Sequence, residues 1–171
     1  MRPILLGTTL VCLLSACANM PGSGPSATAN IAPASGSKTK GTVSFTQKGS
    51  NVLVSADISV LTPGAHGFHI HEKGDCSAPD GMSTGGHFNP GSKPHGHPLR
   101  GEHHVGDIPA LEADAAGNAR MSIELSGINL GSGADSIIGK GVIVHAAPDD
   151  YKTQPTGNAG GRVGCGVIVL R

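Results

Sequence analysis

The chain has 171 residues with twelve basic and twelve acidic side chains, so its formal charge is balanced. Its length suits one domain with short appendages, and the charge gives no indication of a nucleic acid or another polyanionic partner. With 27 glycines, 12 prolines, no tryptophan and only three phenylalanines and one tyrosine, a conventional aromatic core is excluded. This composition favours an all-β domain with many turns and long loops over a helical bundle.

The first sixteen residues are typical of an export signal. Arg2 precedes a short apolar run from Ile4 to Leu14 that is too short to cross a bilayer comfortably. The run ends in Leu14-Ser15-Ala16-Cys17, which resembles the lipobox of bacterial lipoproteins, where the cysteine carries the lipid and becomes the first mature residue. An ordinary signal peptide with an incidental Cys17 is the alternative. We expect export to the bacterial periplasm and a membrane tether through lipidated Cys17, with no other membrane contact.

The segment that follows lacks apolar periodicity. Ala18 to Ser37 is rich in Ala, Pro, Gly and Ser, as flexible linkers are. We therefore expect a signal peptide over residues 1–16, a lipidated N-terminus and flexible tether over residues 17–38, and the folded domain over residues 39–171.

Alternation of apolar and polar residues with period two dominates the folded part. The clearest case runs from Val52 to Val60, and Ala119 to Leu125 repeats the pattern. No segment has convincing helical periodicity, so the sequence predicts an antiparallel barrel or sandwich. The other expected strands are Thr42–Thr46, His66–His71, Ile137–His145 and Val163–Leu170.

A long stretch without strand signal, Glu72 to Gly106, interrupts this pattern. Loops of that length in a compact domain are usually functional or disordered. The stretch carries Cys76, and with Cys12 removed and Cys17 lipidated, Cys76 and Cys165 form an even pair in an exported protein. We expect a disulfide between them. A disulfide and bound metal could order the loop where a hydrophobic core cannot.

The clustering of the histidines indicates a metal site. Eight of nine lie between His66 and His104, and His145 ends an apolar run. Imidazole is the commonest protein ligand for copper and zinc. His69 and His71 share one face of a strand, so both can bind one metal while Phe68 and Ile70 enter the core. Any single histidine could instead be solvated, and from the residues alone His95 could exchange with His97, and His103 with His104.

Four motifs together resemble the copper/zinc superoxide dismutase family of the bacterial exported type. They read GFHIHEKGDC from Gly67, GGHFNP from Gly85, HHVGD from His103 and GNAGGRVGCGVI from Gly157. The resemblance extends from about Lys40 to Leu170 and implies a Greek-key β-barrel or sandwich of about eight antiparallel strands, with one copper and one zinc ion per subunit. By family spacing the copper ligands are His69, His71, His87 and His145, and the zinc ligands are His87, His95, His104 and Asp107.

The resemblance also implies the chemistry, which is disproportionation of superoxide to oxygen and hydrogen peroxide. His87 would bridge the metals and take part in proton transfer, and Arg162 would attract the anion. Asp149 would link ligands of the two metals. His66 matches a structural position. The segment between His145 and Arg162 lacks the charged steering cluster of animal members, so Arg162 is the one basic residue assigned to steering.

Two other classes compete with the enzyme. A periplasmic copper or zinc buffer on the same fold would be favoured by loss of His87 or Arg162, and neither is lost; the surplus His97 and His103 are its only support. A structural envelope lipoprotein would not require matched ligand spacing in four motifs. The expected partner is superoxide, and the protein is expected to be a monomer or a homodimer.

Overall fold

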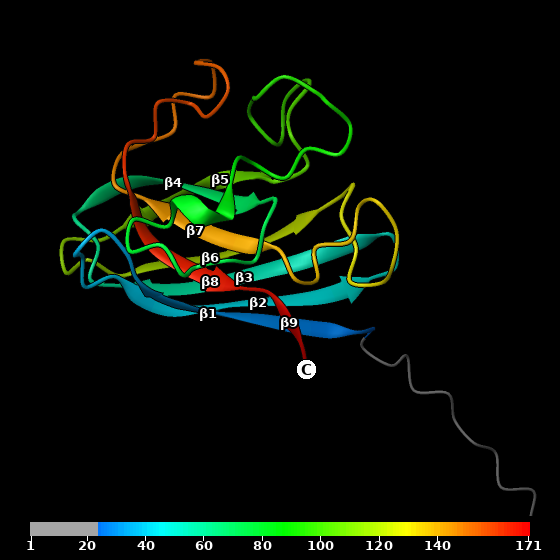
Figure 1. The fold of residues 1–171 in the computed structure, drawn as a ribbon, viewed down its shortest axis with the longest axis horizontal. Coiled ribbons are helices and arrows are strands. Elements are labelled where there is room, and N and C mark those ends of the chain that lie inside the picture. Colours follow the sequence, from blue (N-terminus) through cyan, green and yellow to red (C-terminus); the bar gives the residue numbers. More distant parts are fainter. Residues whose placement is uncertain (1–23) are drawn as a thin grey trace, which may run out of the picture.

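A computed structural model describes residues 24–171, which form an all-β domain (Figure 1). One short 3₁₀ helix, η1 (Met82–Thr84), is the sole helical element in this range, and none of the described residues forms a helix long and apolar enough to cross a membrane. The strands are β1 (Ser26–Pro33), β2 (Lys40–Lys48), β3 (Asn51–Ser59), β4 (Gly64–His71), β5 (Asp107–Ala113), β6 (Ala119–Leu125), β7 (Gly141–His145), β8 (Arg162–Val167) and β9 (Val169–Leu170).

The strands pair antiparallel and close into a barrel. Their order in the sheet is β2-β3-β6-β5-β4-β7-β8-β1-β9, and an additional pairing of β1 with β2 closes it. The steps from β3 to β6 and from β4 to β7 join strands that are distant in sequence, which is the Greek-key arrangement. The predicted Greek-key barrel of about eight strands is therefore confirmed, with the two-residue β9 added beside β1.

The barrel interior follows the alternation seen in the sequence. Val52, Val54 and Ile58 on β3 are fully buried and Ala56 is buried with them, while Leu53, Ser55 and Asp57 alternate with them and pair with polar residues of β2 and β6. The core is mainly aliphatic, and Phe45 and Phe68 are its fully buried aromatic side chains. Burial of these side chains is the main source of fold stability, about 1.5–3 kcal/mol for each large apolar residue.

The prediction of a flexible tether over residues 17–38 is wrong from Ser26 onward. Ser26–Pro33 is strand β1, which pairs with β2 from Ser26 opposite Thr46 to Ile31 opposite Gly41 and also reaches β8 and β9. Two of its three buried residues are small: Ala27 and Ala29 face inward, followed by the larger Ile31. Alanine carries little of the apolar signal, so the alternation does not stand out in the sequence. The domain starts near Ser26, not at residue 39. Cys17 and the signal peptide lie outside the described residues.

Two other strand boundaries differ from expectation. Strand β5 was not predicted, although Asp107 at its start was assigned as a ligand. The expected strand from Ile137 begins only at Gly141, because Gly139 adopts a left-handed φ of 76° and turns the chain. This turn remains bonded to the barrel through the Gly139 N–H, which donates to the Ile168 carbonyl.

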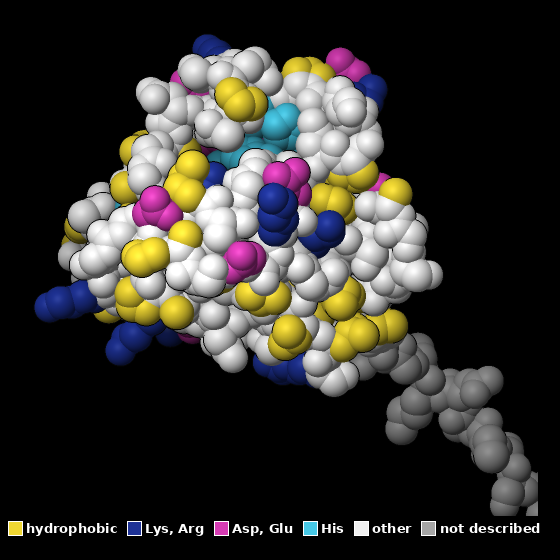
Figure 2. All heavy atoms as spheres, viewed as in Figure 1, with side chains coloured by type: hydrophobic (Ala, Val, Ile, Leu, Met, Phe, Trp, Pro, Cys, Tyr) yellow, Lys and Arg dark blue, Asp and Glu magenta, His cyan; other side chains and the backbone are white. Residues whose placement is uncertain are grey.

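Two long connections, residues 72–106 and 146–161, project from the same side of the barrel (Figure 1). The first is the loop predicted to lack strands. Its middle and its last residue are hydrogen-bonded to Ile70 of β4: the Phe88 N–H donates to the Ile70 carbonyl, and the Ile70 N–H donates to the Gly106 carbonyl, both at 2.8 Å. Figure 2 shows histidine side chains in the hollow between the two projecting lobes.

Candidate metal centre

A set of four buried histidines gathers beside the end of β4. His69 and His71 come from β4, His145 from the end of β7, and His87 from the 72–106 loop. One ring nitrogen from each lies within 4.8 Å of the others. In each of the four rings one nitrogen is buried without a hydrogen-bond partner, namely His69 Nδ1, His71 Nε2, His87 Nε2 and His145 Nε2. Unpaired buried polar atoms are costly, so their convergence fits a cation that completes them.

The second ring nitrogen of the three strand histidines is bonded to the protein. His71 Nδ1 donates to the Gly85 carbonyl at 2.9 Å, and His145 Nδ1 donates to the Gly160 carbonyl at 3.1 Å. His69 Nε2 donates to Asp149 at 2.7 Å. Such bonds fix the tautomer and the ring plane of a metal ligand, which leaves the opposite lone pair available to the metal.

A second set surrounds Asp107 at the start of β5. The Asp107 Oδ1 atom lies 2.8 Å from His87 Nδ1, 3.1 Å from His95 Nδ1 and 3.4 Å from His104 Nδ1. Ligands bound tetrahedrally at about 2.0–2.1 Å are separated by about 3.3 Å, so the arrangement fits a closed site of three nitrogens and one oxygen. His87 belongs to both sets: it offers Nε2 to the first and Nδ1 to the second.

Asp149 connects the two sets through the ring nitrogens that face away from the metals. Its Oδ2 accepts from His69 Nε2, and its Oδ1 accepts from His95 Nε2 at 2.9 Å and from the Tyr151 N–H at 2.7 Å. The carboxylate is buried with an exposed fraction of 6 %. The structure thus places Asp149 in the linking position that the family resemblance implies.

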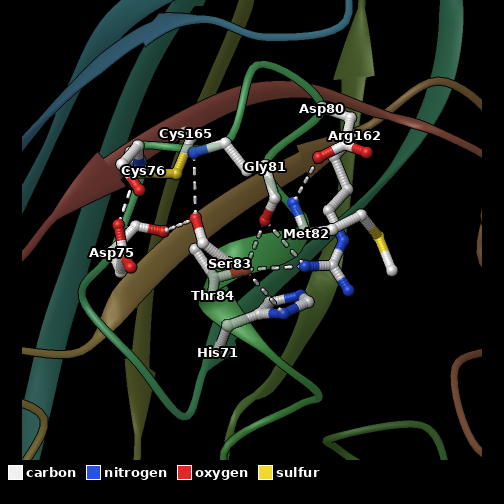
Figure 3. Close-up of a disulfide and its surroundings, with 12 residues drawn as sticks. His71, Asp75, Cys76, Asp80, Gly81, Met82, Ser83, Thr84, Arg162 and Cys165 are labelled. Carbon is white, nitrogen blue, oxygen red and sulfur yellow. Dashed lines mark hydrogen bonds between the residues drawn. A yellow bond between two sulfur atoms is a disulfide. The ribbon is translucent and has the colours of Figure 1, made fainter.

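The Cys76–Cys165 disulfide is present, with 5.9 Å between the Cα atoms, and it attaches the 72–106 loop to β8 (Figure 3). Arg162, the first residue of β8, reaches back into the same loop. Its guanidinium donates to the Gly81 carbonyl at 2.9 Å and to the Gly85 carbonyl and Thr84 hydroxyl at 2.7 Å. The disulfide and these bonds together hold the arginine against the loop that carries His87.

A cavity of about 350 Å³ opens next to this arginine. His145 and Arg162 line it together with Asp80 and Met82. The cavity therefore brings solvent to a ligand of the four-histidine set and to a guanidinium at once. A small anion that enters it meets a positive charge beside the candidate metal position.

Burial and hydrogen bonding shift the pKa values of the buried histidines in opposite directions. Burial lowers the pKa of His145 to about 3 and that of His87 to about 4. For His95, burial acts in the same direction, but hydrogen bonds to Asp107 and Asp149 outweigh it and raise its pKa to about 9. For both carboxylates burial would raise the pKa, but hydrogen bonds from the histidines hold it well below its usual range. The four-histidine set thus presents neutral nitrogens at neutral pH, while the aspartates stay charged.

The metal-free protein is expected to lose stability as the pH falls from about 6.5 to about 4. The folded pKa values of His87 and His145 lie below the unfolded value of about 6.5, so the unfolded chain binds the extra protons in that window. At pH 4.5 the loss should be on the order of several kcal/mol. His95 has the opposite effect at higher pH. Its contribution to the free energy of unfolding is complete below about pH 6.5 and is lost as the pH rises toward 9.

Urea unfolding of the metal-free protein at several pH values measures this effect. A His145→Asn variant, which lacks one of the titrating groups, should show a weaker dependence on pH. A free energy of unfolding that stays constant between pH 6.5 and 4.5 would contradict the assignment of buried neutral histidines.

The remaining histidines stay outside both sets among residues 24–171. His66 Nδ1 donates to the His145 carbonyl at 2.7 Å, which supports β7 at its last residue, and His66 Nε2 lies beside the Thr62 hydroxyl at 3.2 Å. His97 Nδ1 accepts from the Leu99 N–H, and His103 Nδ1 donates to the His104 carbonyl. The choice that the sequence left open is thereby decided geometrically: His95 and His104 reach Asp107, whereas His97 and His103 do not enter the set.

Several residues that support the site have no clear signal in the sequence. Thr84 is fully buried and accepts from Arg162, and the Gly85 and Gly160 carbonyls orient ligand rings. Gln154 bonds the backbone of His95. Backbone carbonyls carry no side-chain identity, and an isolated Thr or Gln in a loop is usually a solvated surface residue. Only the glycine-rich sequence around residues 85 and 160 indicated that these segments belong to the site.

The barrel and its two adjoining ligand sets define a class, that of β-barrel proteins with two candidate metal sites that share one buried histidine. Residues 39–168 match the family model of copper/zinc superoxide dismutase (SODC). The chain is also similar to the crystal structure of the clock protein EA4, with 41 % sequence identity, a TM-score of 0.78, and coverage of 88 % of this chain and 97 % of that one. The chain belongs to the copper/zinc superoxide dismutase family, so it is an oxidoreductase that acts on superoxide.

Proposed function

We propose that this superoxide dismutase holds copper in the four-histidine set and zinc in the set around Asp107, and that it protects the cell envelope from superoxide. The main observation that supports this proposal is the position of His87. Its ring is buried, and its two nitrogens face the two sets. Four imidazoles suit copper, which changes oxidation state, whereas three nitrogens and a carboxylate in a closed tetrahedron suit zinc. Bound copper supplies the one-electron redox chemistry of the reaction.

The residues around the metals bind the substrate and move protons. Two superoxide ions and two protons give one oxygen and one hydrogen peroxide, so an anion must be captured twice and protons must reach the second one. Arg162 supplies the positive charge at the cavity. His87 Nε2 faces the four-histidine set and has no hydrogen-bond partner in the protein, so it is the ring nitrogen placed to pass a proton to the second anion. Asp149 keeps His69 and His95 oriented throughout.

Replacement of Arg162 by alanine is expected to lower kcat/KM for superoxide by at least about tenfold, because local positive potential raises capture rates of anions by about 10–10³. The loss should be accompanied by a weaker dependence of the rate on ionic strength, since the removed charge is the one that salt screens. Pulse-radiolysis or stopped-flow decay of superoxide, recorded at several salt concentrations with equal copper content, measures both quantities.

Arg120 provides a matched control for this variant. It is an exposed arginine on β6 paired with Asp57, and it lies on the barrel wall away from the metal sets. Arg120→Ala should leave both rate and salt dependence unchanged. Arg162→Lys should retain part of the rate, because it keeps a charge but cannot make the forked bonds to Gly81, Thr84 and Gly85. Metal-loaded protein without turnover in wild type and variants would favour the metal-buffer hypothesis over the enzyme.

We also propose export to the bacterial periplasm and a lipid anchor on Cys17, which lies outside the described residues. The sequence of the first seventeen residues and the Cys76–Cys165 disulfide support this proposal, because stable disulfides are typical of oxidising compartments. Mass spectrometry of the protein from bacterial membranes should find a mature N-terminus at Cys17 carrying acyl chains, and Cys17→Ser should shift the protein to the soluble periplasmic fraction. An unmodified mature chain would refute the anchor. Sedimentation of the same samples would distinguish monomer from homodimer.

A further inference from the structure

A side-chain amide in the 146–161 loop forms two hydrogen bonds with the backbone of one candidate ligand in the 72–106 loop. The Gln154 Oε1 atom accepts from the His95 N–H at 2.8 Å, and the Gln154 Nε2 donates to the His95 carbonyl at 2.9 Å. These bonds pair both backbone polar groups of His95 with one amide, much as a neighbouring strand would. Within residues 24–171 no other protein group pairs with the His95 backbone.

The ring of His95 is already held on both sides. Its Nδ1 points to Asp107 in the candidate zinc set, and its Nε2 donates to Asp149 at 2.9 Å. The residue is buried with an exposed fraction of 3 %, but it lies in a loop without regular structure. Its backbone position therefore depends on contacts outside a strand or helix, and the Gln154 amide provides them across 59 positions in sequence.

The 146–161 loop is built to lie close over this ligand. Gly157 has a left-handed φ of 66°, and a Cβ atom there would collide with Asp149 Oδ1 and lie 2.6 Å from His95 Nε2. Tyr151 attaches the same loop elsewhere: its hydroxyl accepts from the Ala110 N–H of β5 at 2.8 Å, and its ring lies 4.5 Å from that of His97. The loop that carries Gln154 is thus fixed to β5 and to the ligand loop independently of any metal.

We propose that Gln154 is a positioning residue that retains zinc by fixing the backbone of His95, so that zinc release requires this amide to detach first. The inference depends on the proposed assignment of zinc to the set around Asp107. It assigns to Gln154 a function in metal retention rather than in turnover. It also joins the two loops at the zinc side, in the same way that the disulfide and Arg162 join loop and barrel at the copper side.

The test compares wild type with Gln154→Leu, which loses both bonds, and Gln154→Glu, whose carboxylate still accepts from the His95 N–H but cannot donate to the His95 carbonyl. Loss of groups that orient metal ligands typically costs about 10–100-fold in metal affinity. We expect zinc release to an excess of a chromogenic chelator to be about 10–100-fold faster in Gln154→Leu and intermediate in Gln154→Glu. With Co²⁺ in place of zinc, the visible absorption bands should change in the same order.

Gln47 is the matched control. Its amide also bonds backbone groups, accepting from the Leu130 N–H at 2.9 Å and donating to the Gly49 and Asn51 carbonyls, but it lies on β2 away from the metal sets. Gln47→Leu should lower thermal stability and leave the zinc release rate and the Co²⁺ spectrum at wild-type values.

Two outcomes would overturn the proposal, and they differ. If wild type holds zinc and Gln154→Leu releases it at the same rate, the retention role of Gln154 is refuted while the dismutase assignment stands. If wild type takes up no zinc at the Asp107 set, the metal assignment fails and the inference fails with it. Superoxide turnover of the same samples reports on the enzyme separately.

Discussion

The His87→Ala variant is expected to lose metal from both sets at once. His87 is the one residue that contributes a nitrogen to each, with Nε2 in the four-histidine set and Nδ1 beside Asp107. Removal of a group that only orients ligands costs about 10–100-fold in affinity, so removal of a shared ligand should cost at least about 100-fold for each metal. Copper and zinc contents after dialysis against a competing chelator measure the loss, and superoxide turnover should fall to background.

Single-set variants complete this experiment. His71→Ala should reduce copper retention and leave zinc in place, whereas His104→Ala should do the reverse, because each belongs to one set. The barrel core does not include His87, so the variant should keep a β-sheet circular dichroism spectrum. Retention of either metal at wild-type affinity in His87→Ala would show that the two sets do not share this ligand in solution.

Removal of the disulfide is expected to have the second large effect. The bond joins residues 89 apart in sequence, and the chain-entropy model gives about 4–5 kcal/mol for such a closure, within the roughly 2–5 kcal/mol typical of native disulfides. Cys165 is buried beside Ala34 and Ile143, and Cys76 packs against this group. The Cys76→Ser/Cys165→Ser double variant should therefore unfold at a clearly lower urea concentration.

The same variant should also lose turnover beyond what its stability explains. The disulfide attaches the segment whose Gly81, Thr84 and Gly85 hold Arg162 in place, so its loss frees the arginine side chain (Figure 3). At a temperature where the variant is fully folded, kcat/KM should fall toward the value of Arg162→Ala. Wild type treated with a reductant should behave in the same way, while the double variant should be insensitive to it. Equal turnover in the oxidised and reduced protein would contradict this coupling.

Local sequence chemistry was sufficient to predict an antiparallel barrel or sandwich, and the family resemblance supplied the expected membership of both ligand sets. Strand β3 could be predicted because Val52, Val54 and Ile58 recur at every second or fourth position. An alternation of apolar and polar residues with period two is typical of a strand. His69 and His71 could be placed on one face for the same reason. The motif spacing then distinguished His95 and His104 from their neighbours, a choice that residue chemistry alone left undecided and that the structure decides in the same way.

Strand β1 shows where such reasoning fails. Its inward side chains Ala27 and Ala29 are too small to stand out from a linker composition, and the segment becomes a strand because β2, β8 and β9 offer it partners. Propensity within Ser26–Pro33 does not require this outcome. Tertiary pairing decides it, as it commonly does for strands.

The orientation of the site is likewise a property of the folded chain. Residue identity was enough to indicate that this group of histidines could bind a metal, because ligand preference belongs to the side chain itself, and the family resemblance assigned the members to copper and to zinc. Which nitrogen of each ring faces the metal depends on bonds to distant groups, such as Asp149 for His69 and the Gly160 carbonyl for His145. The hydrogen bonds between the Gln154 amide and the His95 backbone also join two different loops. These contacts exist only after the barrel has brought remote segments together, so no local pattern encodes them.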